Sequence, residues 1–236
     1  MESWQEDLIQ EMMVSQCEDR FFKKLTDIAR NMDFDYCAYG LRTPIPVSNP
    51  KIVLINNYPS EWKRRYHTNN YIDIDPTVKH GIQSLDPIIW DEKVFATAPE
   101  FWEEARSFGL HWGWAQSCRD VHGVMGMLTM ARSEEPLIDD ELREKAEKMR
   151  WLAQYSHVSL SHIISKDLLP ELDIELTKRE IKVLQLTADG KTSSEISRIL
   201  GIAERTVNYH INNTIRKFGT TNKVAATVRA AVLGLL

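Results

Sequence analysis

The sequence is poor in cysteine, with only Cys17, Cys37 and Cys118 among its 236 residues. These three are scattered and odd in number, and none has the spacing of a zinc or redox motif. This argues against a disulfide framework or a zinc site, and a reducing compartment is expected. Long apolar runs are also missing, since no stretch approaches the roughly 18 residues that a membrane helix needs. The segment MESWQEDLIQEMM at the start is acidic and has no apolar signal-peptide core, so we expect a cytoplasmic protein with no membrane partner.

Acidic residues outnumber basic ones in the first part of the chain, and basic residues outnumber acidic ones in the last. From Leu176 onward there are ten Lys and Arg against four Asp and Glu, a net charge of +6, which leaves −11 for the first 175 residues out of a total of −5. A basic end piece on an acidic body indicates two domains, with the basic one a candidate for binding a polyanion. A chance excess on a small solvated domain is the alternative that charge alone leaves open.

The chain divides at a proline-containing segment near residue 170. We predict a domain over residues 1–165, a linker over 166–175 and a second domain over 176–236. In the first domain, β-branched and aromatic segments predict five strands, at 34–42, 51–57, 87–90, 113–120 and 124–132. Apolar periodicity predicts helices at 2–13, 18–31, 59–67, 76–82, 99–109 and 139–164. Helices before, between and after the strands predict an α+β fold, an α/β/α sandwich around a five-stranded antiparallel sheet.

The second domain begins with two helix-start signals of the same kind. Thr177 and Glu180 form one capping box and Thr192 and Glu195 form another, each a hydroxyl followed three residues later by a carboxylate. Two further helices are expected at about 204–218 and 222–233, so this domain is predicted to be all-α with four helices. The helix after the second capping box is expected to bury Ile196, Ile199 and Leu200.

The third helix of this domain has two contrasting faces. Val207 and Ile211 fall on one face, while Arg205, Asn208 and Asn212 fall on the other at helical spacing. Arg and Asn side chains can form paired hydrogen bonds to guanine and adenine edges in a major groove. A small helical bundle with a merely polar outer face would show the same period, so the helix period by itself does not decide between them.

The residues from 176 to 226 resemble the tetrahelical helix-turn-helix domain of LuxR-type transcription regulators. The resemblance rests on Leu176-Thr-x-Arg179-Glu180, Gly190-Lys191-Thr192, Glu195-Ile196, Glu204-Arg-Thr206-Val207-x-x-His210, Lys217 and Asn222-Lys223. It implies double-stranded DNA as a partner. Candidates for base contact are Arg205, Asn208 and Asn212, and candidates for phosphate contact or structural support are Lys191, Thr206, Arg216 and Lys217. Ala203 departs from the pattern, because relatives often have a serine N-cap there, worth about 1 kcal/mol of helix stability.

The first domain lacks the paired acids of a phosphoacceptor receiver and contains NYPSEWKRRYHTNNYIDIDPTVKHG at 57–81. This domain resembles the acyl-homoserine lactone-binding domain of quorum-sensing LuxR-type regulators. The resemblance rests on Asn57-Tyr58-Pro59-x-x-Trp62-x-x-x-Tyr66, Tyr71, Asp75-Pro76, Trp90, Phe101-Trp102-x-x-Ala105, Gly109-Leu110 and Gly113. It implies an N-acyl-homoserine lactone as the ligand, with no cofactor and no metal.

The resemblance also implies roles for the pocket residues. Trp62 would donate its indole N–H to the lactone carbonyl, and Asp75 would accept the amide N–H. Tyr58 would donate its hydroxyl to the acyl carbonyl, with help from Thr129. Further pocket residues are Trp90, Phe101, Ala105 and Leu110, which would wall the head, and Tyr66 and Tyr71, which would pack along the ligand.

Each of these residues also has a plainer interpretation. Aromatic side chains beside a strand are usually core, Asp75 can cap the helix that follows it, and Thr129 can be an ordinary strand residue. The joint spacing of Tyr58, Trp62 and Asp75 beside Trp90 favours the ligand.

Taken together, these features predict a ligand-gated transcription regulator and not an enzyme. We expect a homodimer that is paired through the sensing domain, including 139–164, and through the last helix, and that binds a palindromic DNA site. RNA polymerase is a further candidate partner. The alternative is an orphan DNA-binding regulator gated by another small molecule or by none. A lactone hydrolase or synthase would need a nucleophile or metal cluster that the sequence does not show.

Overall fold

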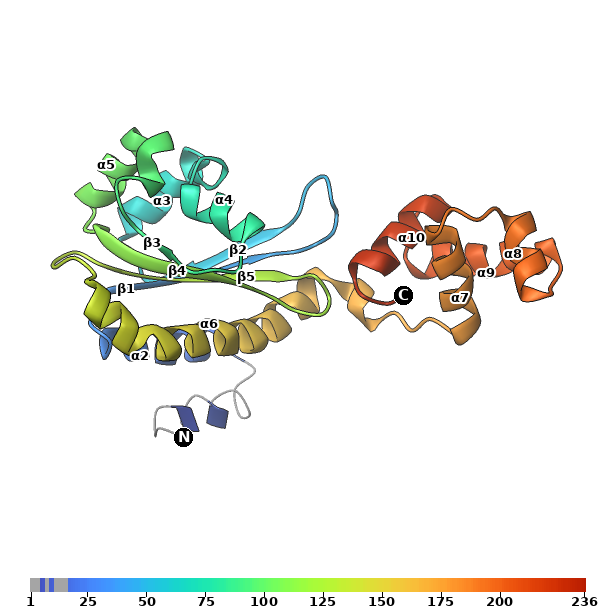
Figure 1. Ribbon diagram of the computed structural model, residues 1–236, viewed down its shortest axis with the longest axis horizontal. Helices are drawn as coiled ribbons and strands as arrows, with labels where there is room; N and C mark the ends of the chain where they lie inside the picture. Colours follow the sequence, from blue (N-terminus) through green and yellow to red (C-terminus); the bar gives the residue numbers. More distant parts are fainter. Residues whose placement is uncertain (1–4, 7–8, 11–16) are drawn as a thin grey trace. The chain divides into compact units, whose positions relative to one another are not determined.

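The structure is a computed structural model that describes residues 5–6, 9–10 and 17–236 (Figure 1). The helix expected over residues 2–13 lies largely outside the described residues. The chain forms two compact units. The first comprises the described residues up to Arg42, with Ile52–Asp120 and Met125–Ile164; the second comprises Thr43–Lys51, Val121–Val124 and Ser165–Leu236. Within the described part of the chain, no helix is long and apolar enough to cross a membrane.

The first unit is built around a five-stranded antiparallel sheet. Its strands lie in the order β2-β1-β5-β4-β3, so that β2 and β3 form the two edges. The strands are β1 (Tyr36–Arg42), β2 (Ile52–Asn56), β3 (Ile88–Ile89), β4 (Trp112–Arg119) and β5 (Met125–Arg132). Each coincides with one of the five predicted strands, although β3 keeps only the two central residues of the predicted segment.

Strand register aligns side chains in rows across the sheet. Ala38 of β1 pairs with Asn56 of β2 on one side and with Thr129 of β5 on the other. The next residue, Tyr39, pairs with Leu128. Because successive side chains alternate between the two faces of a strand, Ala38, Asn56 and Thr129 share one face and Tyr39 and Leu128 share the other.

Helices cover both faces of this sheet, which confirms the predicted α/β/α sandwich (Figure 1). One face carries α2 (Glu18–Arg30) and α6 (Asp139–Leu168). The other carries α3 (Ser60–Thr68), α4 (Pro76–Gln83) and α5 (Pro99–Ser107), together with the short 3-10 helices η1 (Tyr71–Asp73) and η2 (Val94–Thr97). α2 buries Phe21, Leu25 and Ile28, the apolar stripe that predicted it.

The second unit contains the four predicted helices. They are α7 (Lys178–Ala188), α8 (Ser193–Leu200), α9 (Glu204–Lys217) and α10 (Lys223–Val232), and η3 (Pro170–Asp173) precedes them. Both capping boxes form as predicted: Thr177 accepts from the backbone N–H of Glu180, and Thr192 accepts from that of Glu195. α9 follows Ala203, which makes no side-chain cap. The helix starts are therefore set by local sequence at α7 and α8 and by packing at α9.

The core of this unit lies between α7, α8 and α9 and contains Val183, Ile196, Val207 and Ile211. The prediction that Ile199 is buried was wrong, because it is 53% exposed. The side of α8 that packs against the neighbouring helices carries Ile196 and Leu200. Ile199, three positions after Ile196, lies at the edge of this side. On α10, Val224 and Val228 are also exposed, at 64% and 41%. α10 therefore presents an apolar ridge that its own unit does not cover.

Candidate functional site

A cavity of about 610 Å³ lies in the first unit between the sheet and the helices α3, α4 and α5. Its volume is within the usual range for small-molecule sites. The structure brings nine of the ten predicted ligand residues to its walls: Tyr58, Trp62, Tyr66, Asp75, Trp90, Phe101, Ala105, Leu110 and Thr129. The tenth, Tyr71, packs against the aromatic cluster of the cavity without lining the cavity itself.

Aromatic side chains enclose one end of the cavity. Trp62 is 2% exposed, and the rings of Phe95 and Trp102 stack with their centroids 4.0 Å apart. Trp90 fills the space beside Gly113, where an added Cβ would come within 2.4 Å of the indole ring. The indole N–H groups of Trp90 and Trp102 are buried, and no described residue accepts a hydrogen bond from them. An orphan donor of this kind costs about 1–3 kcal/mol, which a ligand carbonyl could offset.

Asp75 caps α4 and lines the cavity at the same time. Its Oδ1 accepts from the backbone N–H of Thr77 at 2.9 Å and from the Thr77 hydroxyl at 2.7 Å, while Oδ2 accepts from the hydroxyl of Tyr66 at 2.9 Å. The cap interpretation is confirmed, yet it does not use all the acceptor positions of a carboxylate. Burial raises the pKa of Asp75, against the opposing effect of the hydrogen bonds from Thr77 and Tyr66. A further donor from a ligand would favour the charged carboxylate.

The two tyrosines beside Asp75 are set up as donors. Burial raises the pKa of Tyr58 well above its usual value, and Cys37 and Asp75 add to the shift. Burial likewise raises the pKa of Tyr66, with Asp75 as the next contributor. Both phenols therefore keep their protons at neutral pH. Tyr66 donates its hydroxyl hydrogen bond to Asp75, and Tyr58 lines the cavity.

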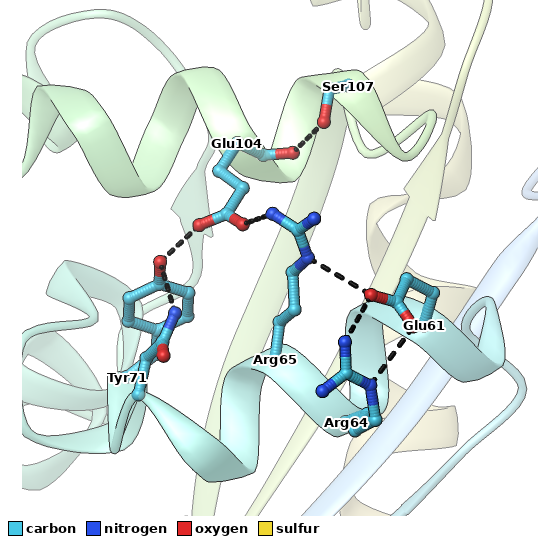
Figure 2. A network of polar contacts seen from close by, with 7 residues as sticks. Glu61, Arg64, Arg65, Tyr71, Glu104 and Ser107 are labelled. Carbon is cyan, nitrogen blue, oxygen red and sulfur yellow. Dashed lines mark hydrogen bonds and ion pairs between the residues drawn. The ribbon is translucent and has the colours of Figure 1, made fainter.

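A polar network ties the helices together beside the aromatic end (Figure 2). Arg65 of α3 donates to Glu104 of α5 and, over 3.3 Å, to Glu61; Arg64 donates to Glu61 as well. Tyr71 of η1 donates its hydroxyl to the other carboxylate oxygen of Glu104, which explains why it does not line the cavity. The hydrogen bonds from Tyr71 and Arg65 lower the pKa of Glu104. The network joins α3, η1 and α5, three of the elements that surround the cavity.

Sequence reasoning missed the remaining lining residues. They include Thr77 and Val78 at the start of α4, Phe95 and Trp102 in the aromatic cluster, and a set from the sheet and the rim: Ala38, Gly40, Ile52, Leu54, Asn56, Lys63, His67, Asn70, Ile72 and Met127. The strand positions carry a usable signal. Once Thr129 is placed on the cavity face, alternation along the strand puts Met127 on it too.

The three residues predicted to contact bases lie on the exposed face of α9. Arg205, Asn208 and Asn212 are exposed, while Val207 on the opposite side is fully buried. The hydroxyl of Ser193, in the first turn of α8, donates to Oδ1 of Asn208 at 2.8 Å. This contact fixes the Asn208 amide with its N–H₂ group free to donate. Tyr209, 60% exposed on the same helix, and Ser193 are surface candidates that the sequence reasoning overlooked.

The four residues predicted for phosphate contact or support have different surroundings in the structure. Lys191 is exposed directly before the first turn of α8, and Arg216 is exposed near the end of α9 with a hydrogen bond to Asn213. Thr206 is half-buried in the first turn of α9. Lys217 is committed inside the unit, because its ammonium lies 2.7 Å from Oε2 of the buried Glu180. This placement favours support for Lys217 and leaves Lys191 and Arg216 accessible to a phosphate.

Two family descriptions match the chain. Residues 18–160 match "Autoinducer binding domain", and residues 175–230 match "Bacterial regulatory proteins, luxR family". The chain is 45% identical over 238 residues to the transcriptional activator protein AnoR of Acinetobacter nosocomialis, with 100% of both chains covered. It also matches the crystal structure of Escherichia coli SdiA, at 30% identity and a TM-score of 0.84, over 99% of this chain and 98% of that one. A structure of SdiA in complex with octanoyl-rac-glycerol matches with the same TM-score and identity, over 99% of this chain and 95% of that one.

Proposed function

The chain belongs to the LuxR family of bacterial regulatory proteins, with an autoinducer-binding domain before its helix-turn-helix domain, and on this premise we propose that it is a receptor for an N-acyl-homoserine lactone. It is a quorum-sensing transcription regulator and not an enzyme. We assign sensing and pairing to residues 1–165, a linker to 166–175 and DNA binding to 176–236. Its place of action is the cytoplasm, where the DNA lies.

The observation that carries the ligand proposal is a set of buried polar groups among the aromatic and apolar side chains of the cavity. Trp62 and Asp75 are 2% and 8% exposed, and both line the cavity. An amide-lactone presents carbonyls that need donors and one N–H that needs an acceptor. A plain hydrocarbon offers neither. It could not pair with the indole N–H of Trp62 or with the acceptor position of Asp75 that Thr77 and Tyr66 leave open.

The residues take the following roles in this proposal. The indole of Trp62 donates to the lactone carbonyl, the free acceptor position of Asp75 takes the amide N–H, and Tyr58 donates to the acyl carbonyl beside Thr129. Walls around the head come from Trp90, Phe101, Ala105 and Leu110, and Tyr66 orients Asp75 through its hydroxyl. Tyr71 lies outside the cavity wall and supports it through its hydrogen bond to Glu104. Ligand binding to the folded state raises stability by mass action.

For the DNA-binding domain we propose a homodimer on a palindromic site. The exposed Val224 and Val228 give α10 an apolar ridge that a second copy can cover, and α6 contributes to pairing of the sensing domains. The two copies of α9 would then enter successive major grooves. Arg205, Asn208 and Asn212 face the bases in this arrangement, and Lys191 and Arg216 face phosphates. RNA polymerase is a further proposed partner, since AnoR is named a transcriptional activator.

Selection of duplexes from a random pool by the full chain tests the DNA part, with and without a lactone. We expect enrichment of two inverted half-sites about one helical turn apart. Asn208→Ala should change the enriched sequence, and Lys191→Ala should weaken binding to every duplex alike. Val224→Glu should abolish the paired half-sites. Enrichment of a single, unpaired half-site would refute the dimer.

A second candidate ligand is a monoacylglycerol, because the similar SdiA has been solved with octanoyl-rac-glycerol. Its ester and hydroxyl oxygens could also accept from Trp62 and Tyr58, and one of its hydroxyls could donate to Asp75 where the lactone would offer its amide N–H. Direct comparison of the two ligand classes at equal chain length decides between them.

A further inference from the structure

The cavity is enclosed at one end and open at the other. At the enclosed end, Trp62 and Leu110 are each 2% exposed and Trp90 is 7% exposed. At the other end it is lined by Ile52 and Leu54 of the edge strand β2, which are 43% and 46% exposed. The cavity's other exposed polar lining residues are Lys63, His67 and Asn70.

This asymmetry fixes the direction of a bound acyl compound. The polar groups that would hold its head, on Trp62 and Asp75, are buried. The head therefore has to enter deeply, and the tail has to point towards the open end. There the exposed Ile52 and Leu54 offer apolar surface that water otherwise covers, which is unfavourable for the unliganded protein.

The strand register gives the length of the path from head to rim. Its start is the row of Thr129 and Ala38, where the proposed function places the acyl carbonyl. Two residues along is the row of Gly40 and Leu54, and two further residues lead to the row of Ile52. At about 3.4 Å per residue the whole path is about 14 Å. A hydrocarbon advances about 1.25 Å per carbon, from a bond near 1.5 Å and an angle near 111°, so about eleven carbons span it.

The floor of this path is kept clear by small residues. Ala38 and Gly40 line the cavity on β1, and a Cβ added to Gly40 would lie 3.2 Å from Cδ2 of Leu54. Gly40 is not among the glycines with positive φ, so its backbone does not require glycine. The missing side chain instead leaves room in front of Leu54.

We infer that the lactone of this receptor has a long acyl tail, of about ten to twelve carbons, whose last carbons lie on Leu54 and Ile52 at the β2 edge. The inference rests on the proposed function and specifies its ligand class. A short tail ends before Leu54 and leaves both side chains in water. Because the rim is open, carbons beyond about the twelfth pass into solvent and neither improve nor prevent binding.

The test is a series of unsubstituted lactones from butanoyl to tetradecanoyl, with dissociation constants measured on the full chain. A fully buried methylene tightens binding about fourfold. We expect at least about a hundredfold gain from butanoyl to decanoyl, since part of the tail stays wet at the rim, and less than about a threefold change from dodecanoyl to tetradecanoyl. A closed tail pocket would instead show an optimum at short length and a loss of more than about tenfold at dodecanoyl.

Two variants and one matched control localise the effect. Leu54→Ala should weaken the dodecanoyl lactone about fivefold and the butanoyl lactone by less than about twofold. Val53 lies on the opposite face of the same strand, so Val53→Ala should leave the affinities for both the dodecanoyl and the butanoyl lactone unchanged. Gly40→Val should obstruct the path, so that the dodecanoyl lactone loses its advantage over the butanoyl one.

The outcomes separate this inference from the proposed function. Two results together support the inference: binding tightens with acyl chain length, and Leu54→Ala weakens the long-chain lactones more than the short-chain ones. Lactone binding with a short-chain optimum, or equal loss for both lengths in Leu54→Ala, overturns the inference and leaves the proposed function standing. If no lactone of any length binds the folded chain, the proposed function and the inference are both refuted.

Discussion

Replacing Lys217 by methionine separates a lysine that supports the fold from one that contacts DNA. The ammonium of Lys217 lies 2.7 Å from Glu180 Oε2 and 2.8 Å from the backbone carbonyl of Glu175. Glu180 is only 3% exposed. Its burial on its own raises its pKa, but the hydrogen bonds from Lys217 and Thr177 outweigh burial and lower the pKa overall. Methionine keeps the length of the lysine stem and leaves the carboxylate without its cation.

The expected loss of stability follows from these contacts. Removing one partner of a fully buried pair costs about 3–5 kcal/mol. The side chain of Lys217 is 35% exposed, and Glu180 keeps its hydrogen bonds with Thr177, so we expect about 2 kcal/mol. A change of 1 kcal/mol moves the midpoint of a domain of about 60 residues by about 4–8 °C. The midpoint of the DNA-binding domain should therefore fall by about 8–16 °C.

Thermal unfolding of the full chain by circular dichroism measures this change, and DNA affinity over a salt series gives the second readout. Lys217→Met should lower the midpoint and leave the salt slope unchanged. Lys191 is an exposed lysine before α8, so Lys191→Met should leave the unfolding midpoint unchanged and lower the salt slope of DNA binding by about 1. Adding Glu180→Gln to Lys217→Met should recover about half of the loss, because the buried charge is gone. An unchanged midpoint with a reduced salt slope in Lys217→Met would refute the reasoning.

Three further predictions concern stability. Ala203→Ser should raise the midpoint of the DNA-binding domain, because it adds the side-chain cap that α9 lacks, worth about 1 kcal/mol, and Ala203→Val, which cannot cap, is the control. Glu104→Gln should destabilise the sensing domain by less than about 1 kcal/mol, since its partner Arg65 is 45% exposed; a larger loss would show the network to be more than a surface contact. Hydrogen bonds from Arg132 lower the pKa of Glu141, and the pKa of Glu180 is also lowered, so the folded chain binds fewer protons than the unfolded chain in acid. Stability from both groups is complete above their usual pKa of 4.5 and is lost as pH falls through the lowered pKa values. The raised pKa of Asp75 acts in the opposite sense in the sensing domain, so the test is the DNA-binding domain, where a midpoint that rises on acidification from pH 5 would contradict the Glu180 assignment.

Features that depend on neighbouring residues in the sequence could be predicted. The capping boxes at Thr177 and Thr192 need only a hydroxyl and a carboxylate three residues apart, and both form. Alternating and helical patterns of apolar residues predicted the strands and most helices, because an element with one buried face has apolar residues at its own structural repeat. Nine of the ten ligand candidates line one cavity, and their choice came from the resemblance to a family and not from the hydrophobic period.

Features that depend on distant contacts could not be predicted. Tyr71 looks like another wall residue in the sequence, but its hydroxyl meets Glu104, 33 residues away. Lys217 reads as one more basic residue until α7 places Glu180 beside it. Ile199 fits the apolar stripe of α8, and only packing shows that it lies on the flank. The open end of the cavity likewise depends on β2 being an edge strand, which local sequence does not reveal.

The central claim is that a lactone binds in the cavity through Asp75, and thermal unfolding of the full chain with a panel of acyl-homoserine lactones tests it most directly. A ligand at a hundred times its dissociation constant adds about 2.7 kcal/mol, so the midpoint should rise clearly with a long-chain lactone. Asp75→Asn keeps an oxygen to cap α4 but turns an N–H₂ group towards the ligand amide, and the lost hydrogen bond of about 1.5–3 kcal/mol should weaken binding roughly 10- to 100-fold. We predict a rise that Asp75→Asn reduces by about half if binding weakens 10-fold and almost removes if it weakens 100-fold. A well-folded chain whose midpoint no lactone changes, or an Asp75→Asn variant that responds as fully as the parent, would contradict it.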